Sequence, residues 1–220
     1  MISAEPAPPT VSLDRRRRNG LLGGFALALV VMLVAEVLRV FVGQNPHMVV
    51  KNRCYRGAQP FGSHFESILR TRNIRTVINL RGDNPEQSWY WREKAVSQRC
   101  GVAFVDAGMM GTMPTETDAF RFAVKSIDEA EEPILFHCYS GSDRTGLASA
   151  IYLLLRTDTP LPKAWEQLHW RYGHLAWGRA RVMNDVLADY ADWLRERRLE
   201  HRREHFLTWT NTVYHYVNRE

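Results

Sequence analysis

Residues 134–146 read Ile134-Leu135-Phe136-His137-Cys138-Tyr139-Ser140-Gly141-Ser142-Asp143-Arg144-Thr145-Gly146. The apolar run at 133–137 predicts a buried strand, and the apolar run at 145–156 predicts a helix. A loop between a strand and a helix N-terminus directs several backbone N–H groups inward, and the helix dipole adds partial positive charge. We therefore expect an anion-binding loop at this point of the chain.

The side chains of this loop suggest covalent chemistry on the bound anion. Cys138 at the loop start is expected to be held as a thiolate and to act as a nucleophile. Arg144 is suited to hold two oxygens of an anion and to stabilise charge in a transition state. Gly141 permits the tight turn. Thr145 is expected to donate its hydroxyl to the sulfur, and His137 to hydrogen-bond the loop backbone.

The spacing by itself is a weak signal, because this chain is rich in arginine. A cysteine followed six residues later by an arginine is expected about 0.3 times by chance in such a composition. A histidine before the cysteine and a glycine three residues after it lower that expectation to the order of 0.001. The strand before the loop and the helix after it make the pattern more specific still.

The pattern His137-Cys138-x5-Arg144-Thr145-Gly146 resembles the signature loop of the cysteine-dependent protein tyrosine phosphatase superfamily. Two further stretches resemble its compact, atypical dual-specificity branch: Tyr55-Arg56-Gly57-Ala58-Gln59-Pro60 and Thr76-Val77-Ile78-Asn79-Leu80-Arg81. The resemblance covers residues 49–157.

The resemblance implies a phosphatase that forms a cysteinyl-phosphate intermediate and needs no metal or other cofactor. It implies that Cys138 is the nucleophile, that Arg144 clamps the phosphate and that Tyr139, Ser140, Gly141, Ser142 and Asp143 form the backbone cradle. The histidines at 201, 205 and 215 form no metal set with any nearby cysteine, so we expect no zinc site.

Three residues are candidates for the general acid that protonates the leaving oxygen. Members of this family place an aspartate about thirty residues before the cysteine, which favours Asp106 at the end of a predicted strand. The loop after it is rich in Gly and Met. Asp143 inside the cradle is the second candidate, since a similar Asp-Arg pair occurs in myotubularins. Asp118 is the third, in the next predicted helix.

The pattern on either side of the loop alternates between strands and helices. Strands are predicted at 49–55, 75–81, 102–106 and 133–137, and helices at 61–71, 85–99, 114–130 and 145–156, with further helices around 161–172, 180–198 and 202–217. This order predicts an α/β fold with a mostly parallel central sheet flanked by helices. The last helices are expected to close one side.

Composition limits the remaining possibilities. The chain has 220 residues, 45% of them hydrophobic, and a net charge of +5. The charge is too diffuse for a nucleic-acid footprint, so we expect no nucleic-acid partner. Three cysteines cannot form a disulfide framework. Cys54 and Cys100 are expected to pack as small apolar residues, with a reversible disulfide as the alternative.

The N-terminal region divides into a basic tail, residues 1–19, and an apolar segment, residues 20–42. The apolar segment is long enough to span a bilayer. A signal peptide needs a small-residue cleavage site, which is not evident here, and the arginines at 15–18 argue against a buried core helix. We therefore expect a transmembrane signal anchor, followed by a linker and phosphatase domain with a C-terminal helical extension, residues 43–220.

The four arginines before the span predict that the tail stays in the cytoplasm. The protein is then a single-pass protein of the inner membrane with a periplasmic catalytic domain. This location favours an envelope lipid or a glycolipid such as lipid A over a phosphoprotein as substrate. The aromatic residues at 165–177 suit either helix packing or a lipid-facing rim. A protein tyrosine or dual-specificity phosphatase and a non-catalytic phosphate-binding module are the alternatives.

Overall fold

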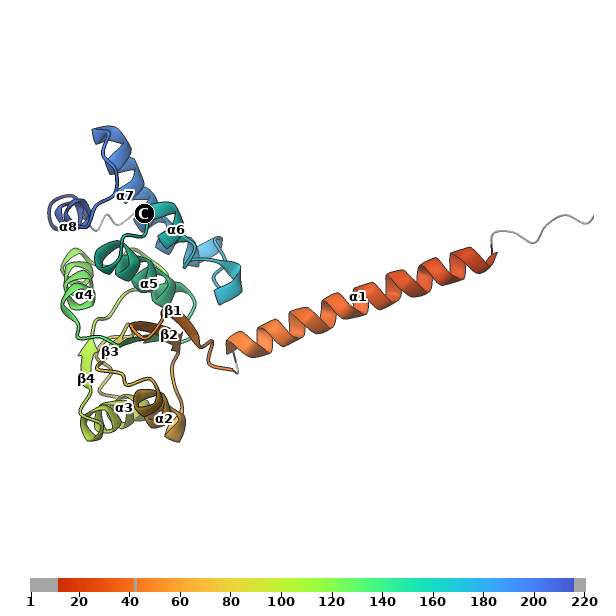
Figure 1. The fold of residues 1–220 in the computed structure, drawn as a ribbon, viewed down its shortest axis with the longest axis horizontal. Helices are drawn as coiled ribbons and strands as arrows, with labels where there is room; N and C mark the ends of the chain where they lie inside the picture. Colours follow the sequence, from red (N-terminus) through yellow and green to blue (C-terminus); the bar gives the residue numbers. More distant parts are fainter. Residues whose placement is uncertain (1–11, 42, 216–220) are drawn as a thin grey trace, which may run out of the picture. The chain divides into compact units, whose positions relative to one another are not determined.

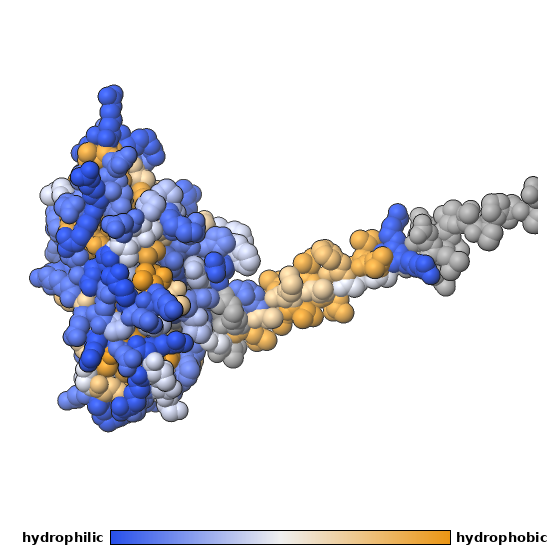
Figure 2. Space-filling view, in the orientation of Figure 1, coloured by the Kyte–Doolittle hydropathy of each residue, from blue (hydrophilic) through white to orange (hydrophobic). Residues whose placement is uncertain are grey.

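The computed structural model describes residues 12–41 and 43–215. This part of the chain divides after Arg39 into two units, of which the second contains the sheet and all other helices. In the first unit, α1 (Ser12–Phe41) includes the segment Arg17–Leu38, with a mean hydropathy of 2.5 and none of it buried. Figure 2 shows apolar side chains along most of this helix and hydrophilic ones near its start. Its length and composition suit a membrane span, and a signal sequence has the same features.

The second unit is built on a five-stranded sheet with the order β1-β2-β5-β3-β4. Its strands are β1 (His47–Val50), β2 (Cys54–Ala58), β3 (Thr76–Asn79), β4 (Ala103–Asp106) and β5 (Ile134–Cys138). Only β1 and β2 pair in an antiparallel way; the other neighbours are parallel. The predicted α/β fold with a mostly parallel sheet is confirmed, and β5 lies at its centre.

The helices cover both faces of the sheet (Figure 1). On one face lie α2 (Gly62–Thr71) and α3 (Ser88–Arg99); on the other lie α4 (Thr117–Glu129) and α5 (Asp143–Arg156). Beyond α5 follow α6 (Leu161–Trp165), two short 3-10 turns at Trp170–Tyr172 and Gly178–Arg181, α7 (Val182–Arg197) and α8 (Arg203–Thr212). Both α7 and α8 pack against α5, so the C-terminal helices close that side.

The strand residues alternate between the two faces, as the period of two requires. Ile78 and Phe136 belong to the core beneath α4 and α5, whereas Val77 and Leu135 pack against the α2 side. Because β5 is covered on both faces, its side chains are all buried. The carboxyl end of β5 therefore emerges from the middle of the domain, and this position sets the location of the loop at 138–143.

Two predicted elements differ from the structure. The strand expected at 49–55 is two antiparallel strands, because Asn52 adopts a positive φ of 59° and the chain turns there. Asn tolerates this conformation better than most residues. The helix expected around 161–172 ends at Trp165, and a separate 3-10 turn ends at Gly173, which has a φ of 78°.

Candidate active site

The loop at 138–143 joins the end of β5 to the start of α5. Cys138 is the last residue of the strand, and its side chain is almost completely buried, with 2% of the residue exposed. The backbone N–H of Gly141 donates to Cys138 Sγ at 3.3 Å. The loop therefore curls around the sulfur, as the strand–loop–helix pattern predicts.

The carbonyl groups of residues 139–142 all point outward, to donors from other parts of the chain. The Gln59 backbone N–H binds the carbonyl of residue 139 at 3.2 Å. Asn45 Nδ2 binds those of 140 and 141, and Arg56 Nη2 binds those of 141 and 142 at 3.0 and 3.1 Å. In a trans peptide the N–H points opposite to the C=O. The N–H groups of residues 140–143 therefore face inward, and they form a cradle for an anion.

The cradle depends on a close approach of two glycines. Gly141 adopts a φ of 72°, and a Cβ built on it would lie 2.4 Å from the carbonyl carbon of Gly57 and 2.5 Å from the backbone nitrogen of Ala58. These are backbone atoms of β2, which cannot move aside as a flexible side chain would. Glycine is thus required at 141 by both its backbone angle and its surroundings.

Arg56 supplies a buried positive charge behind the cradle. Its guanidinium bonds to the backbone carbonyl and side chain of Gln167 and lies 4.2 Å from the centre of the Tyr172 ring. Burial lowers the pKa of Arg56 to about 10, so the group is still cationic at neutral pH. This cation attracts an anion bound on the other side of the loop.

Two more guanidinium groups lie beside the cradle. Arg144 Nη1 lies 3.3 Å from the carbonyl oxygen of Leu80 and 3.5 Å from that of Met109, which places the group between the loops that follow β3 and β4. Arg81 stacks on the Trp89 ring at 4.0 Å and bonds to Gln59. Burial and the nearby Arg144 lower the pKa of Arg81. This edge of the cradle is strongly cationic.

His137 and Glu93 form a buried pair beneath the loop. His137 Nε2 lies 3.4 Å from Glu93 Oε2, and both side chains are almost completely buried. Burial lowers the pKa of His137 to about 4 and raises that of Glu93 to about 8. Both groups are therefore uncharged near neutral pH. The backbone of Cys138 at the start of the loop interacts with the His137 ring and opposes the lowering of its pKa, in line with the predicted contact to the loop backbone.

The remaining cradle residues differ in their surroundings. Tyr139 exposes its side chain, and the hydroxyls of Ser142 and Ser140 lie 3.1 Å apart. Thr145 is completely buried, and its hydroxyl has no partner among the described residues. The hydrogen bond that we expected from Thr145 to the sulfur is therefore not formed in this part of the structure.

Asp106 lies at the end of β4, as predicted, but its carboxylate is already engaged. Oδ1 accepts a hydrogen bond from Asn79 Nδ2 at 2.9 Å, and Oδ2 accepts one from the Tyr90 hydroxyl at 2.6 Å. Lys94 Nζ lies 3.1 Å from the same Oδ2. Neither oxygen is free to carry a proton to a leaving group in this arrangement, which favours a structural role for Asp106.

The other two candidate acids have different positions. Asp143 is the first residue of α5, and its Oδ1 lies 2.6 Å from Nδ1 of the buried His174. Asp118 lies in the first turn of α4 with its side chain fully in solvent, 3.7 Å from Arg121. Of the three aspartates, Asp143 is the one that belongs to the cradle loop itself.

Sequence reasoning did not assign the residues that support the cradle from outside: Asn45, Arg56, Gln59, Glu93 and His174. Arg56 and Gln59 lie in the quoted stretch at 55–60, and Glu93 lies in the helix predicted at 85–99. Asn45 and His174 lie in irregular segments without a periodic pattern. Within residues 12–41 and 43–215, no group of three metal-ligating side chains is placed to hold a metal ion.

Comparisons with known proteins agree with this geometry. A curated relative, the beta-lactamase hydrolase-like protein of Xylella fastidiosa, is 34% identical over 95 residues, which are 42% of this chain. The match spans only 22% of that relative's length.

Two solved structures share the fold. TpbA of P. aeruginosa has a TM-score of 0.53 and 20% identity, over 70% of this chain and 91% of its own. The catalytic core of Siw14 from S. cerevisiae has a TM-score of 0.50 and 18% identity, over 70% of this chain and 92% of its own.

A family model described as the tyrosine phosphatase family matches residues 41–157, which is more than half of the chain. This segment runs from before β1 to the end of α5, so it contains the cradle, Cys138 and Arg144. The chain therefore belongs to the tyrosine phosphatase family.

Proposed function

We propose that the protein is a membrane-anchored phosphatase that hydrolyses phosphomonoesters through a cysteinyl-phosphate, with an envelope lipid or glycolipid as substrate. The observation that carries the chemistry is the cradle. Four inward N–H groups surround Cys138, and Arg144 stands at its edge. A phosphoryl group bound there has its three oxygens held and its phosphorus facing the sulfur.

The reaction then proceeds in two displacements. The thiolate of Cys138 attacks phosphorus, the ester P–O bond breaks, and an acid protonates the leaving oxygen. Water next attacks the cysteinyl-phosphate, the S–P bond breaks, and inorganic phosphate leaves. The N–H groups and Arg144 stabilise the negative charge on the equatorial oxygens in both steps.

The N-terminal helix supports a substrate at the membrane. We propose that residues 1–19 are a cytoplasmic tail, that residues 20–42 anchor the chain in the inner membrane and that residues 43–220 are periplasmic. Between Phe41 and His47 lie only five residues, and a chain of that length extends at most roughly 20 Å. An anchored domain would therefore remain close to lipid headgroups.

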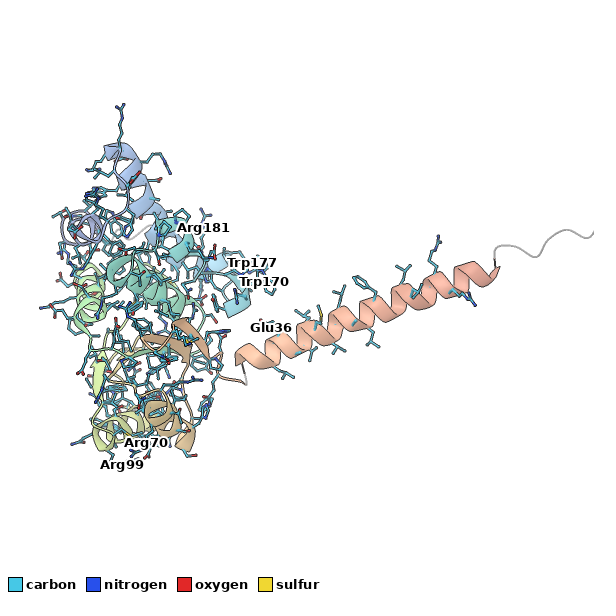
Figure 3. All side chains as sticks on the ribbon, in the orientation of Figure 1. Glu36, Arg70, Arg99, Trp170, Trp177 and Arg181 are labelled. Atoms are coloured by element: carbon cyan, nitrogen blue, oxygen red, sulfur yellow. The ribbon has the colours of Figure 1, made fainter. Side chains whose placement is uncertain are left out.

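Exposed apolar side chains near the cradle also support a lipid substrate. The segment at 170–177 borders the cradle through Tyr172 and His174, and it exposes Trp170 and Trp177 by 63% and 72%. Both tryptophans project outward from the domain, in the same region as Arg181 (Figure 3). Trp and Arg together are typical of the membrane–water interface.

A phosphotyrosine protein is the second candidate substrate. A solved structure of TpbA holds phosphotyrosine. Tyr139 is 69% exposed at the cradle, where an aromatic ring could pack against it. A phosphate-binding module without turnover is the third candidate, and it would follow if no carboxyl group serves as the acid.

A phosphate-release screen separates these candidates. The full-length protein in detergent is given phospholipid and lipid A micelles, phosphotyrosine peptides and an aryl phosphate. We expect release from the lipid substrates at least about tenfold above that from peptides. Release from the peptides alone would support the tyrosine phosphatase, and release from no substrate would support the binding module.

The matched control is Cys138→Ser, which keeps the cradle and loses the nucleophile. We expect it to release no phosphate from any substrate and still to bind inorganic phosphate, measured by calorimetry. Residual turnover in this variant would contradict the assignment of Cys138.

A further inference from the structure

A buried histidine outside the family match contacts the cradle loop. His174 lies between α6 and α7, beyond residues 41–157, and its side chain is completely buried. Its Nδ1 lies 2.6 Å from Asp143 Oδ1 and its Nε2 lies 2.7 Å from Asn184 Nδ2. Asp143 is next to Arg144 in sequence, so the contact reaches the phosphate-binding site itself.

The hydrogen-bond network assigns the position of each proton. The indole N–H of Trp165 can only donate, and it lies 2.8 Å from Asn184 Oδ1. The amide nitrogen of Asn184 therefore faces His174 Nε2 and donates to it. Since Nε2 is an acceptor, the proton of the neutral imidazole is on Nδ1 and is donated to Asp143 Oδ1.

The direction of these hydrogen bonds, from Trp165 through Asn184 and His174 to Asp143, determines where a further proton can bind. His174 Nε2 cannot take one, because the Asn184 N–H already points at it. Asp143 Oδ1 already accepts the Nδ1 proton. The other carboxylate oxygen, Asp143 Oδ2, has no donor among the described residues, and the Asp143 side chain is 32% exposed, in contrast to the buried His174. Any proton that the pair takes up is therefore carried on Oδ2.

We propose that His174, oriented by Asn184 and Trp165, is a positioning residue that makes Asp143 Oδ2 the proton-exchanging group of the site. The proposal rests on the proposed function of Cys138. In the first displacement, the P–O bond breaks, its electron pair stays on the leaving oxygen, and that oxygen takes the proton from Asp143. In the second, the Asp143 carboxylate removes a proton from the water that attacks phosphorus, and the S–P electron pair returns to the sulfur.

Other charged groups near Asp143 act on the same proton. Arg56 in β2 interacts electrostatically with both Asp143 and Cys138, and Arg144 is the next residue along α5. The variants below leave Arg56, Arg144 and Cys138 unchanged, so any change in activity reports on the hydrogen-bond chain through His174.

The leaving group provides a specific test. An aryl phosphate has a good leaving group and hardly needs an acid, whereas an alkyl phosphate does. In the full-length protein, we expect His174→Phe to lower kcat on glycerol phosphate by about tenfold or more, and on para-nitrophenyl phosphate by less than about threefold. KM should change little for both, because the cradle is intact.

The matched control is His201→Phe. His201 is also partly buried in the C-terminal region, and it contacts the Tyr190 hydroxyl and the backbone carbonyl of Leu154, away from the cradle. We expect this variant to lose thermal stability and to keep the alkyl-to-aryl activity ratio. If His174→Phe also kept that ratio, or if its effect added fully to that of Asp143→Asn, the proposal would be overturned.

Asn184→Asp tests the direction of the hydrogen bond between Asn184 and His174. The new carboxylate still accepts the Trp165 N–H, but it presents an acceptor to His174 Nε2. His174 can then hold the added proton on Nε2, so that it no longer resides on Asp143 Oδ2. We expect kcat on glycerol phosphate to fall by about tenfold or more and kcat on para-nitrophenyl phosphate by less than about threefold. An unchanged ratio of the two activities would contradict the proposal. Wild-type protein inactive on both esters would instead refute the proposed function.

Discussion

The shape of the cradle at Gly141 depends on the absence of a Cβ atom at this position. Its positive φ and the backbone of β2 beside it leave no room for a methyl group, since that carbon would stand 2.4 Å from Gly57. Gly101 provides a comparison, because it has a similar φ of 67° and nothing within 4 Å of its missing Cβ. The two glycines share the backbone strain and differ only in the space around them.

We expect Gly141→Ala to cost about 2–4 kcal/mol of unfolding free energy and to abolish phosphate binding, because overpacking adds to the strain. Gly101→Ala should cost about 1 kcal/mol and leave activity unchanged. Urea unfolding and aryl phosphate hydrolysis of both variants measure the difference. Equal losses in the two variants would show that the contact with Gly57 is unimportant.

The buried pair of Glu93 and His137 makes stability depend on pH. The pKa of Glu93 is raised from 4.5 to about 8, so its contribution to stability is full below pH 4.5 and is lost as pH rises toward 8. The pKa of His137 is lowered from 6.5 to about 4, so its contribution grows with pH between those values. The two effects offset each other up to pH 6.5, and a net loss remains from 6.5 to 8.

We therefore expect the wild-type protein to be less stable at pH 8.5 than at pH 6.5, and Glu93→Gln to be equally stable at both. Urea unfolding at the two pH values measures this. The control is Glu129→Gln, at an exposed position, which should behave like the wild type. A pH dependence that persists in Glu93→Gln would mean that another group is responsible.

At the scale of elements, the cradle is supported from outside its own loop. Asn45 and Arg56 come from the segment before β1 and from β2, and they bind loop carbonyls, of which that of Ser142 also accepts the Gly146 N–H of α5. Arg56 also bonds to Gln167 after α6, so one guanidinium joins the loop to β2 and to the C-terminal region. The N–H groups face inward only because these donors hold the carbonyls outward.

We expect Arg56→Lys to lower kcat/KM on an aryl phosphate by at least about tenfold, because an ammonium cannot reproduce the fork of contacts. Arg72→Lys is the control, since Arg72 also lies over a tyrosine ring, that of Tyr55, at 5.4 Å. It should retain full activity. Steady-state kinetics measure kcat/KM for both variants, and thermal unfolding confirms that both are folded. Equal activities of the two variants would contradict the supporting role of Arg56.

At the scale of the whole molecule, an apolar helix precedes a catalytic domain. The segment Arg17–Leu38 has the length and hydropathy of a membrane span; Arg17 and Arg18 are its first residues, and Arg15 and Arg16 precede it. If this helix is an anchor, as we propose, the positive-inside rule predicts a cytoplasmic tail and a phosphatase domain on the opposite side.

We expect a reporter enzyme that folds only in an oxidising compartment to be active when fused to the C-terminus of the full chain. The same reporter fused after residue 19 should be inactive, since the tail is predicted to be cytoplasmic. Activity measured in intact bacteria, with the fusion proteins quantified by immunoblotting, tests the orientation. The reverse pattern would place the domain in the cytoplasm and remove the topological argument for an envelope substrate.

The sequence alone was sufficient for the mostly parallel sheet, the buried strand before Cys138 and the loop and helix that follow it. These features depend on local physics: apolar periodicity sets strand and helix, and the strand–loop–helix order sets the direction of the loop N–H groups. The same local rules missed the turn at Asn52 and the end of α6 at Trp165, where single residues with weak signals end an element.

Only the tertiary structure decided which side chains meet at the site. Asn79, Tyr90 and Lys94 occupy the carboxylate of Asp106, although the spacing favoured that residue as the acid. His174 reaches Asp143 across 31 residues. Contacts of this kind depend on how distant segments pack, and side chains in irregular segments carry no periodic pattern from which the packing could be predicted.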